Sequence, residues 1–346
     1  MHRYLGAVAA AVVLAGMAGC SEKPPAPAEP NSLGLEKIKI PQTQPSAGVE
    51  PFVWLRTSFP PGQYVLHYRS NTIARSHLPP PFAVQKDKEH WWAMSVPAPD
   101  ATGNVTMQLR MTRVRFRRRG DKPLVLDTDD PASMEGTELG AVLKKMKKTM
   151  PRSALTVNRD CQFVRATGMD EVLEVIRSAG PSSASLPSQL ASANRMVYDR
   201  CFPARWLLPE KPVGVGAIWQ ARGSHQLTGK TTLSRQARCR LSELAQTGQG
   251  LHATVEYVLS AEFTTDKPQL PRGWIPTTQT VDKLILRNSG ETITGRLILN
   301  VDTGCLVEQA EWVSQDLHGE AKAEGEKPNA QVRRLIRTTV TATKPG

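Results

Sequence analysis

The longest regular pattern in this 346-residue chain is an alternation of apolar and polar residues from Leu251 to Phe263. Every odd-numbered residue of this stretch is apolar and most even-numbered ones are polar, which is the two-residue period of a β-strand with one buried face. A similar apolar face runs through residues 230–245. The intervening segment 246–250 contains Gly248 and Gly250, which suit a hairpin turn. We therefore expect two paired antiparallel strands here.

Further strands are predicted on both sides of this hairpin. They cover residues 63–72, 90–96, 104–118, 291–301, 305–313 and 331–343. Within 104–118 the apolar positions are odd-numbered up to Met111 and then even-numbered from Val114 onward. Because the side-chain period of a strand is two, this change requires one extra residue, and we expect a β-bulge at Thr112 or Arg113.

Helical patterns are few. Residues 138–150 place apolar side chains on one stripe, and shorter helices are predicted for 169–178 and 185–200. The predicted fold is α+β, mainly antiparallel β, with long curved hairpin sheets packed against a few helices. Residues 155–164 resemble residues 297–307, since each pairs two strands across a turn that contains Asp and Cys. This likeness indicates two related β units, in halves 49–180 and 201–346.

The N-terminus has the layout of an export signal. A basic start at Arg3 is followed by an apolar run of about 15 residues, shorter than the roughly 20 needed to span a bilayer. Met17, Ala18 and Gly19 then precede Cys20, and small residues directly before a cysteine resemble the lipobox of bacterial lipoproteins. The alternatives are a permanent transmembrane anchor and a cleaved signal that leaves Cys20 as an ordinary thiol.

The lipobox resemblance implies that residues 1–19 are a signal peptide and that Cys20 carries a diacylglyceryl group and an N-acyl chain such as palmitate. Ser21 follows the cysteine, and in the enterobacterial sorting pattern that residue favours the outer membrane, facing the periplasm. Residues 20–48 are rich in proline and alanine and resemble an extended tether, because such a segment buries too little surface to offset its ordering entropy. The globular region is then 49–346.

Charge narrows the range of partners. The formal net charge is +12, and loss of Arg3 with the signal leaves 43 basic and 32 acidic residues, or +11. Export argues against nucleic acid, so the anionic partners are lipid head groups, lipopolysaccharide phosphates and acidic polymers. The alternative is that the excess charge only keeps the chain soluble. Arg113, Arg115, Arg117 and Arg119 share one face of a predicted strand, where they could meet anionic head groups or protect a sheet edge.

The globular region contains four cysteines, Cys161, Cys201, Cys239 and Cys305. An even number of cysteines in an oxidising compartment predicts disulfides. Of the three possible connectivities we prefer Cys161–Cys201 with Cys239–Cys305, because each pair stays within one half; buried free thiols are the alternative. No CxxC spacing and no GxSxG serine occurs, so we assign no catalytic, cofactor-binding or metal-binding residue and expect no cofactor.

The segment from Cys201 to Trp219 combines Phe-Pro, Pro-Val and a Val-Gly-x-x-Trp that opens a strand. It is similar to an uncharacterised family of exported bacterial β-rich proteins, which implies long hairpins but no known activity. Long strands with one apolar face are also used by half-barrel lipid carriers of the periplasm. We therefore expect a lipid-anchored envelope protein that binds an apolar ligand or an envelope partner without catalysis. An envelope hydrolase and a structural subunit of an envelope complex are the alternatives.

Overall fold

The computed structural model describes residues 35–76, 82–119, 123–137, 152–168, 205–228, 231–264, 278–281, 284–319 and 330–343, and the single positions 140, 141, 143, 144, 147, 198, 201 and 202. These residues form fifteen β-strands and three short 3-10 helices, η1 (Leu35–Lys37), η2 (Pro131–Met134) and η3 (Arg205–Leu207). Two strands, β1 (Val49–Val53) and β8 (Val213–Val215), pair in a small sheet of their own.

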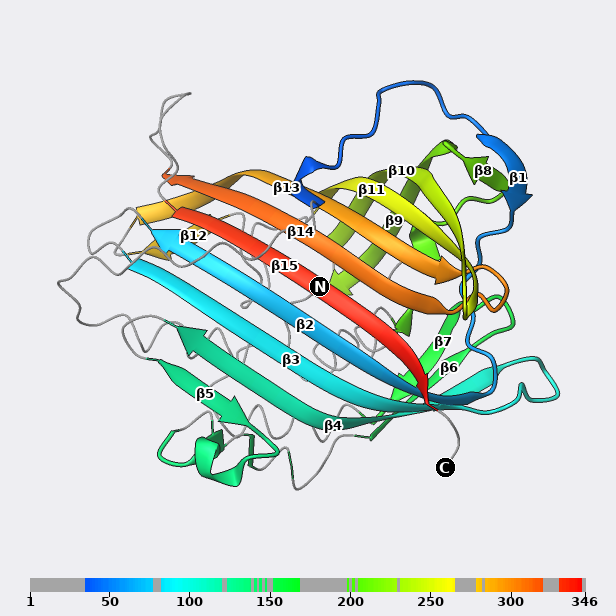
Figure 1. The fold of residues 1–346 in the computed structure, drawn as a ribbon. Helices are drawn as coiled ribbons and strands as arrows, with labels where there is room; N and C mark the ends of the chain where they lie inside the picture. The colour runs from blue at the N-terminus through cyan, green and yellow to red at the C-terminus, as the bar shows by residue number, and fades with distance from the viewer. Residues whose placement is uncertain are drawn as a thin grey trace.

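The other strands form one 13-stranded sheet (Figure 1). They are β2 (Gly62–Ser76), β3 (Phe82–Val96), β4 (Val105–Arg119), β5 (Leu124–Asp127), β6 (Arg152–Val157), β7 (Phe163–Thr167), β9 (Ile218–Thr228), β10 (Thr231–Thr247), β11 (Gly250–Thr264), β12 (Thr278–Val281), β13 (Leu284–Asn300), β14 (Leu306–Gly319) and β15 (Ala330–Thr343). The order along the sheet is β7-β6-β4-β3-β2-β15-β14-β13-β11-β10-β9, with β12 beside β13 and β5 beside β4. All pairs are antiparallel.

The last strand of the chain joins its two halves. β15 pairs with β2 over its whole length, from Thr343 opposite Gln63 to Ala330 opposite Ser76. On its other side β15 pairs with β14. Strands from both halves therefore belong to one continuous sheet, and a relation between the two halves stays a prediction. The segments 155–164 and 297–307 do each form a strand–turn–strand unit, as β6–β7 and β13–β14.

The prediction of an α+β fold is wrong. Nearly all regular structure in the described ranges is antiparallel β, and these ranges contain no helix of seven or more residues. The predicted helix 169–178 lies outside the described residues, and only isolated positions of 138–150 and 185–200 lie within them. The strands were under-predicted because charged stretches such as Gln85–Glu89 do not alternate in polarity, yet they gain their hydrogen bonds from neighbouring strands.

The strand predictions themselves are confirmed. Residues 230–245 and 251–263 form the hairpin β10–β11, which turns between Thr247 and Gly250. The predicted bulge is present in β4, where Trp91 lies opposite Arg113 and Trp92 lies opposite Met111, so that Thr112 is the extra residue. The bulge lets apolar side chains of β4 stay on one face of the sheet along the whole strand.

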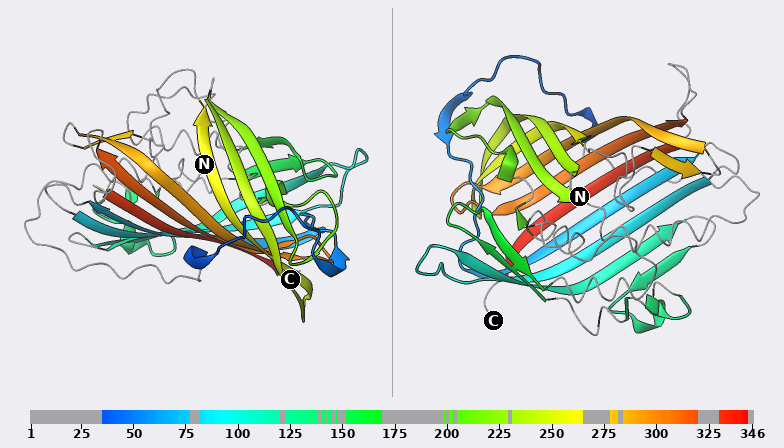
Figure 2. Two further views of the ribbon diagram at one scale, coloured as in Figure 1. Left: turned by 90° about the horizontal axis from the view of Figure 1, so that it is seen from above. Right: turned by 180° about the vertical axis from the view of Figure 1, so that it is seen from behind.

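The sheet is curved, and its two faces differ. Seen from above it bends into a trough, with β9–β11 on one side and β2–β4 on the other (Figure 2). Apolar residues at alternate positions of strands from both sides meet in one core cluster on the concave face. Trp91 and Trp92 illustrate the alternation: Trp92 is 2% exposed in that core, whereas Trp91 lies on the convex face.

The N-terminal described segment crosses the convex face. Leu35 is buried against Ala310 and Trp312, and its carbonyl oxygen accepts a hydrogen bond of 2.5 Å from Thr294 Oγ1. Farther along, Ser46 pairs with Ile218 of β9. Leu35 and Ile40 are therefore buried and Ser46 pairs with the sheet, whereas residues 41–47 are exposed, and the tether of residues 20–48 stays a prediction.

Candidate functional site

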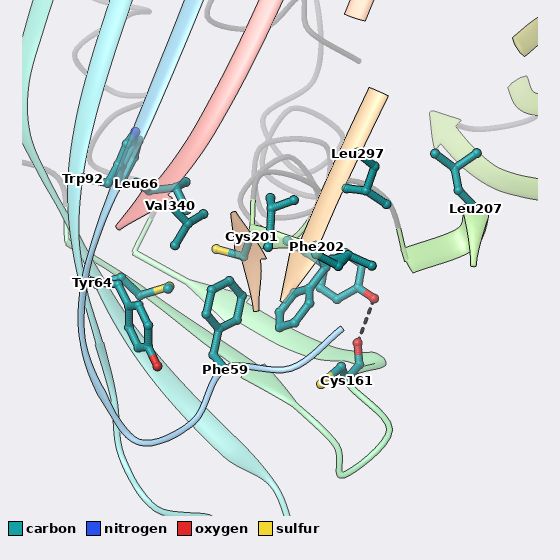
Figure 3. Close-up of a cluster of buried hydrophobic side chains, with 14 of the residues drawn as sticks. Phe59, Tyr64, Leu66, Trp92, Cys161, Cys201, Phe202, Leu207, Leu297 and Val340 are labelled. Atoms are coloured by element: carbon teal, nitrogen blue, oxygen red, sulfur yellow. Dashed lines mark hydrogen bonds between the residues drawn. The ribbon is translucent and has the colours of Figure 1, made fainter. Parts of the chain in front are cut away.

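Cross-strand register arranges the concave face in transverse rows. Because side chains directly opposite one another in an antiparallel pair point to the same side, a row can be followed from strand to strand. One row is apolar and runs from Met111 through Trp92 and Leu66 to Val340. Figure 3 shows Trp92, Leu66 and Val340 facing Leu297 of β13 across the trough. This apolar row belongs to the main core cluster.

An aromatic chain extends the core from this row. Phe59 makes edge-to-face contacts with Tyr64 at 5.4 Å and with Phe202 at 5.3 Å between ring centroids. Phe202 stacks on Tyr198, whose hydroxyl donates a hydrogen bond of 2.8 Å to the carbonyl oxygen of Cys161 (Figure 3). Such ring pairs contribute about 0.5–1.5 kcal/mol each beyond their buried area. They fix this end of the trough as packed core, so a ligand site belongs elsewhere on the face.

A buried polar network lies farther along the concave face, on β11 and β14. The Tyr257 hydroxyl donates to Glu311 Oε1 at 2.8 Å and accepts from Gln309 Nε2 at 2.8 Å. Burial, followed by the negative charge of Glu311, holds the pKa of Tyr257 well above its usual value, so the phenol stays protonated. Gly295 faces the Tyr257 ring, and a Cβ at that position would overlap the ring. The network is therefore built on close contact between a tyrosine and a glycine.

The hydrolase alternative would need an acid, a base and a nucleophile in contact. His90 is the histidine on this part of the concave face, and its ring meets that of Tyr68 edge-on at 5.8 Å. Its cross-strand neighbours are Tyr68 and Val114, neither of which is a nucleophile or a carboxylate. In the part of the chain that the structure describes, no three His, Cys, Asp or Glu side chains are placed to hold a metal ion.

A second apolar cluster lies beside the polar network and adjoins the main core through Ile293. We call it the distal apolar cluster, and it consists of Tyr68, Val313, Ile336 and Ile293. Three of these side chains are buried, and Ile293 is half-buried. The cluster is drawn from four adjacent strands, β2, β15, β14 and β13. It extends the apolar area of the concave face from the main core, with Ile293 in contact with both clusters.

Basic side chains flank this cluster in a single row. We call it the cation row: Arg118, Lys86 and Arg334, with Thr72 between the last two. Arg334 Nε donates to Thr72 Oγ1 at 3.2 Å, and the next residue of the row after Arg334 is Val313 of the distal apolar cluster. Burial, and next the charge of Arg118, lowers the pKa of Lys86 from 10.5 to about 8. All members of the row are half-buried.

The convex face is organised by ion pairs. Asp127 accepts hydrogen bonds from Arg113 Nε at 3.0 Å and Nη2 at 2.5 Å, and these bonds hold the pKa of Asp127 below its usual value. The Arg113 guanidinium also lies 4.9 Å over the Trp91 ring, which stacks on His67.

The interpretation of the arginine run as protection of a sheet edge is wrong, because β4 pairs with β3 on one side and with β5 and β6 on the other.

All four cysteines are free thiols, so the predicted disulfides are not formed. Cys239 lies in the row of Gly295, whereas Cys305 bonds to Asn300, five residues farther along β13. That offset is about 17 Å, well beyond the ~7 Å limit between bonded cysteine Cα atoms. Cys161 and Cys201 are both buried, and burial raises the pKa of the Cys161 and Cys239 thiols. The structure therefore agrees with the alternative stated from the sequence, in which the cysteines are free thiols.

Cys20 lies outside the described residues, so its acylation remains a prediction. Across the described ranges, no helix is both long and apolar enough to cross a bilayer. The largest exposed apolar side chains near the N-terminal segment are Val49 at 68%, Phe52 at 47% and Trp54 at 49% exposure, on or next to β1. They are the surface that the structural-subunit alternative would use.

The sequence did not reveal the cation row or the polar network. Lys86 lies in Gln85–Glu89, which has no apolar alternation, and the strand was expected to begin only at residue 90. Gln309 and Glu311 lie where alternation along β14 would place apolar residues. The sequence contained one indication of the network: Gln309 and Glu311 are polar, lie two residues apart in a predicted strand, and so share one of its faces. Their connection to Tyr257 depends on the pairing of β11, β13 and β14, which no local pattern contains.

Comparison with known proteins gives no family. No family model matches the chain, and no curated protein does. Lipovitellin, in a structure of its lipid–protein interactions, has a TM-score of 0.45 at 9% identity over 84% of this chain and 26% of its own. The chain thus spans about a quarter of the lipovitellin chain it matches.

Two other solved structures are less similar. DynF from the dynemicin biosynthesis pathway of Micromonospora chersina has a TM-score of 0.22 at 10% identity, covering 89% of this chain and 93% of its own. An outer-membrane channel from Pseudomonas putida F1 has a TM-score of 0.24 at 8% identity, covering 82% and 97%. The proposals below are argued from the geometry of the chain itself.

Proposed function

We propose that the protein binds an apolar, lipid-like ligand on the concave face of its sheet, at the distal apolar cluster. The observation that supports this proposal is that cluster itself: Tyr68, Val313, Ile336 and Ile293 form an apolar area on the concave face that adjoins the main core through Ile293. A curved sheet with such an area on its inner face offers the concave, mostly apolar surroundings typical of ligand sites. The proposed activity is binding and requires no reaction.

The proposed location is the cell envelope, with the chain held by lipid on Cys20 and facing the periplasm from the outer membrane. The support is the signal layout of residues 1–19 and the small residues before the cysteine. Two or three acyl chains would make release from the membrane negligible, since each buried methylene adds about 0.8 kcal/mol. A binding site on an anchored carrier would stay within reach of membrane lipid.

Native mass spectrometry of the full chain, extracted in mild detergent from its own membrane, tests this function. We expect a co-purifying lipid mass, and about tenfold less of it with Ile293→Gln, because a polar amide in the distal apolar cluster opposes burial of a chain. Ile298→Gln is the matched control: Ile298 is equally half-buried on the same strand but lies on the convex face. A chain that carries no lipid, or equal losses in both variants, would contradict the proposal.

A further inference from the structure

Exposed apolar side chains gather on one short segment of the chain. Among the described residues, five large hydrophobic side chains are exposed, and three of them, Val49, Phe52 and Trp54, lie within six residues of one another. Single exposed apolar residues are ordinary on a protein, whereas a contiguous group of them marks a surface that contacts something apolar. We call this group, together with the exposed Arg56, the β1 surface.

The fold holds the β1 surface in place. Phe52, Trp54 and Arg56 are exposed, and the residues between them are not. Val53 packs against the main core, and Leu55 is buried within it. β1 is also paired with β8. Because the segment is already ordered by these contacts, binding through its exposed side does not cost the entropy of ordering it.

The chemistry of this surface fits the boundary between a bilayer and water. Tryptophan is enriched at that level of a membrane, because its ring is apolar while its N–H is polar. The Arg56 guanidinium lies 5.0 Å from the centroid of the Trp54 ring, where it can stay with the ring and still reach anionic head groups. Glu50 is exposed on the same strand, so the apolar side chains, rather than local charge, make the main contribution.

The N-terminal segment keeps this surface within reach of a membrane. Cys20, the proposed acylation site, precedes the first described residue, Leu35, by 15 residues. Such a segment spans at most about 50 Å, so it limits how far the protein can move from the bilayer. Val49 follows Leu35 by only 14 residues and lies within a similar distance of it. Confinement near the bilayer raises the effective concentration of lipid at the β1 surface, and a weak contact is then enough.

We propose that the β1 surface inserts its apolar side chains into the head-group region of the bilayer that holds the acyl chains of Cys20. This inference rests on the proposed location and goes beyond it, because a flexible anchor alone leaves the orientation of the protein free. Two attachments, the acylated N-terminus and the β1 surface, fix that orientation. Figure 1 shows β1 and β8 next to β10 at one end of the large sheet, so this end is turned toward the lipid.

The test measures contact between Trp54 and lipid in the full chain, extracted in mild detergent from its own membrane. The protein is reconstituted on vesicles of phosphatidylcholine and phosphatidylglycerol whose acyl chains are brominated near the head group. Bromine quenches tryptophan at short range, so we expect a loss of fluorescence that Trp54→Phe removes. Trp206→Phe is the control, at a half-buried tryptophan of η3, and should keep the whole loss.

A second pair of variants tests the apolar contacts. Val49→Ser with Phe52→Ser should reduce the quenching of Trp54 at least about threefold, because most of the inserted apolar area is removed. Val125→Ser with Val164→Ser is the comparable control. These side chains are 50% and 48% exposed on β5 and β7, and their loss should leave the quenching unchanged. Unfolding temperatures of all variants establish that they fold.

The outcomes separate this inference from the proposed location. If the protein does not sediment with the vesicles, both fail. If it sediments while Trp54 stays unquenched, or if both double variants lose quenching equally, the anchor stands and the inference is wrong. A protein that is a dimer in detergent, and that Val49→Ser with Phe52→Ser dissociates, would assign the β1 surface to a second copy and also overturn the inference. Quenching of Trp54 in a chain whose mass shows no acyl group would support the inference while the proposed anchor fails.

Discussion

The two faces of the sheet are built on the same strands but handle charge in opposite ways. On the convex face, charged side chains form ion pairs across neighbouring strands, as Arg113 does with Asp127 and Arg240 with Glu256. On the concave face, Arg118, Lys86 and Arg334 share a row, and burial together with the charge of Arg118 lowers the pKa of Lys86. The comparison teaches that the ion pairs of the convex face are made between opposite charges on neighbouring strands, whereas Lys86 on the concave face is held in surroundings that disfavour its charged form.

The polar groups show the same contrast. Glu308 on the convex face is flanked by Arg296 at 3.5 Å and by Arg337, both cations. Glu311, three residues on, points to the concave face and accepts hydrogen bonds from Tyr257 and from Gln309. Partly exposed ion pairs contribute little because water screens them, while buried hydrogen bonds are costly to break. Substitutions on the concave face should therefore have the larger effects.

Gly295→Ala is expected to have the largest effect on stability. The new Cβ would overlap the Tyr257 ring, which is fully buried and cannot move without disturbing Glu311, so we expect a loss of about 3 kcal/mol. Chemical denaturation measures this loss. Gly248→Ala, at a turn where a Cβ would meet nothing within 4 Å, is the control and should change stability little. In a Tyr257→Leu background the loss should shrink, and an undiminished loss would show that the ring is not the cause.

Lys86→Met is expected to stabilise the ligand-free protein. Lowering the pKa from 10.5 to about 8 corresponds to at most about 3.5 kcal/mol of destabilisation by the charged form, at ~1.4 kcal/mol per unit, so a gain of about 2 kcal/mol at pH 7 is expected. Denaturation of both proteins without lipid measures it. Among the residues that the structure describes, the strand neighbours of Lys86 on this face include Arg118 opposite on β4, Thr72 opposite on β2 and Lys88 along β3, and these three are not acidic.

The pH dependence of this gain has a defined sign. Below pH 8 both the folded and the unfolded wild-type chains carry the lysine proton, so the full difference in stability between Lys86→Met and wild type is present. Between pH 8 and 10.5 the unfolded wild-type chain binds more protons than the folded one, so wild-type stability rises with pH. The difference in stability between the variant and wild type therefore becomes smaller over this range. A difference that is constant from pH 7 to pH 10.5 would contradict the assignment to Lys86.

Arg337→Gln on the convex face should have the smallest effect. Arg337 Nε donates to Glu308 Oε2 at 2.9 Å, but the arginine side chain is 45% exposed. Since Arg296 still faces Glu308, we expect a loss below about 1 kcal/mol, which a thermal scan at low and high salt can measure. A loss as large as that of Gly295→Ala would remove the distinction between the two faces.

Local patterns predicted the strands wherever one face is consistently apolar. The alternation of Leu251–Phe263 predicted β11, and the shift in parity after Met111 predicted the bulge at Thr112. Prediction failed where both faces carry polar residues, as in Gln85–Glu89, because there the strand is stabilised by its neighbours. The helices proposed for 169–178 and for most of 185–200 lie outside the described residues, so they stay predictions.

The sequence alone determined which side chains share a face of each strand, because the two-residue period is a local property of the backbone. It also supplied the export signal and the predicted acylation of Cys20. Only the tertiary structure decided that β15 pairs with β2, and hence that Arg118, Lys86 and Arg334 form one row. Register between strands far apart in the chain depends on non-local hydrogen bonds and packing, so no stretch of sequence contains it by itself.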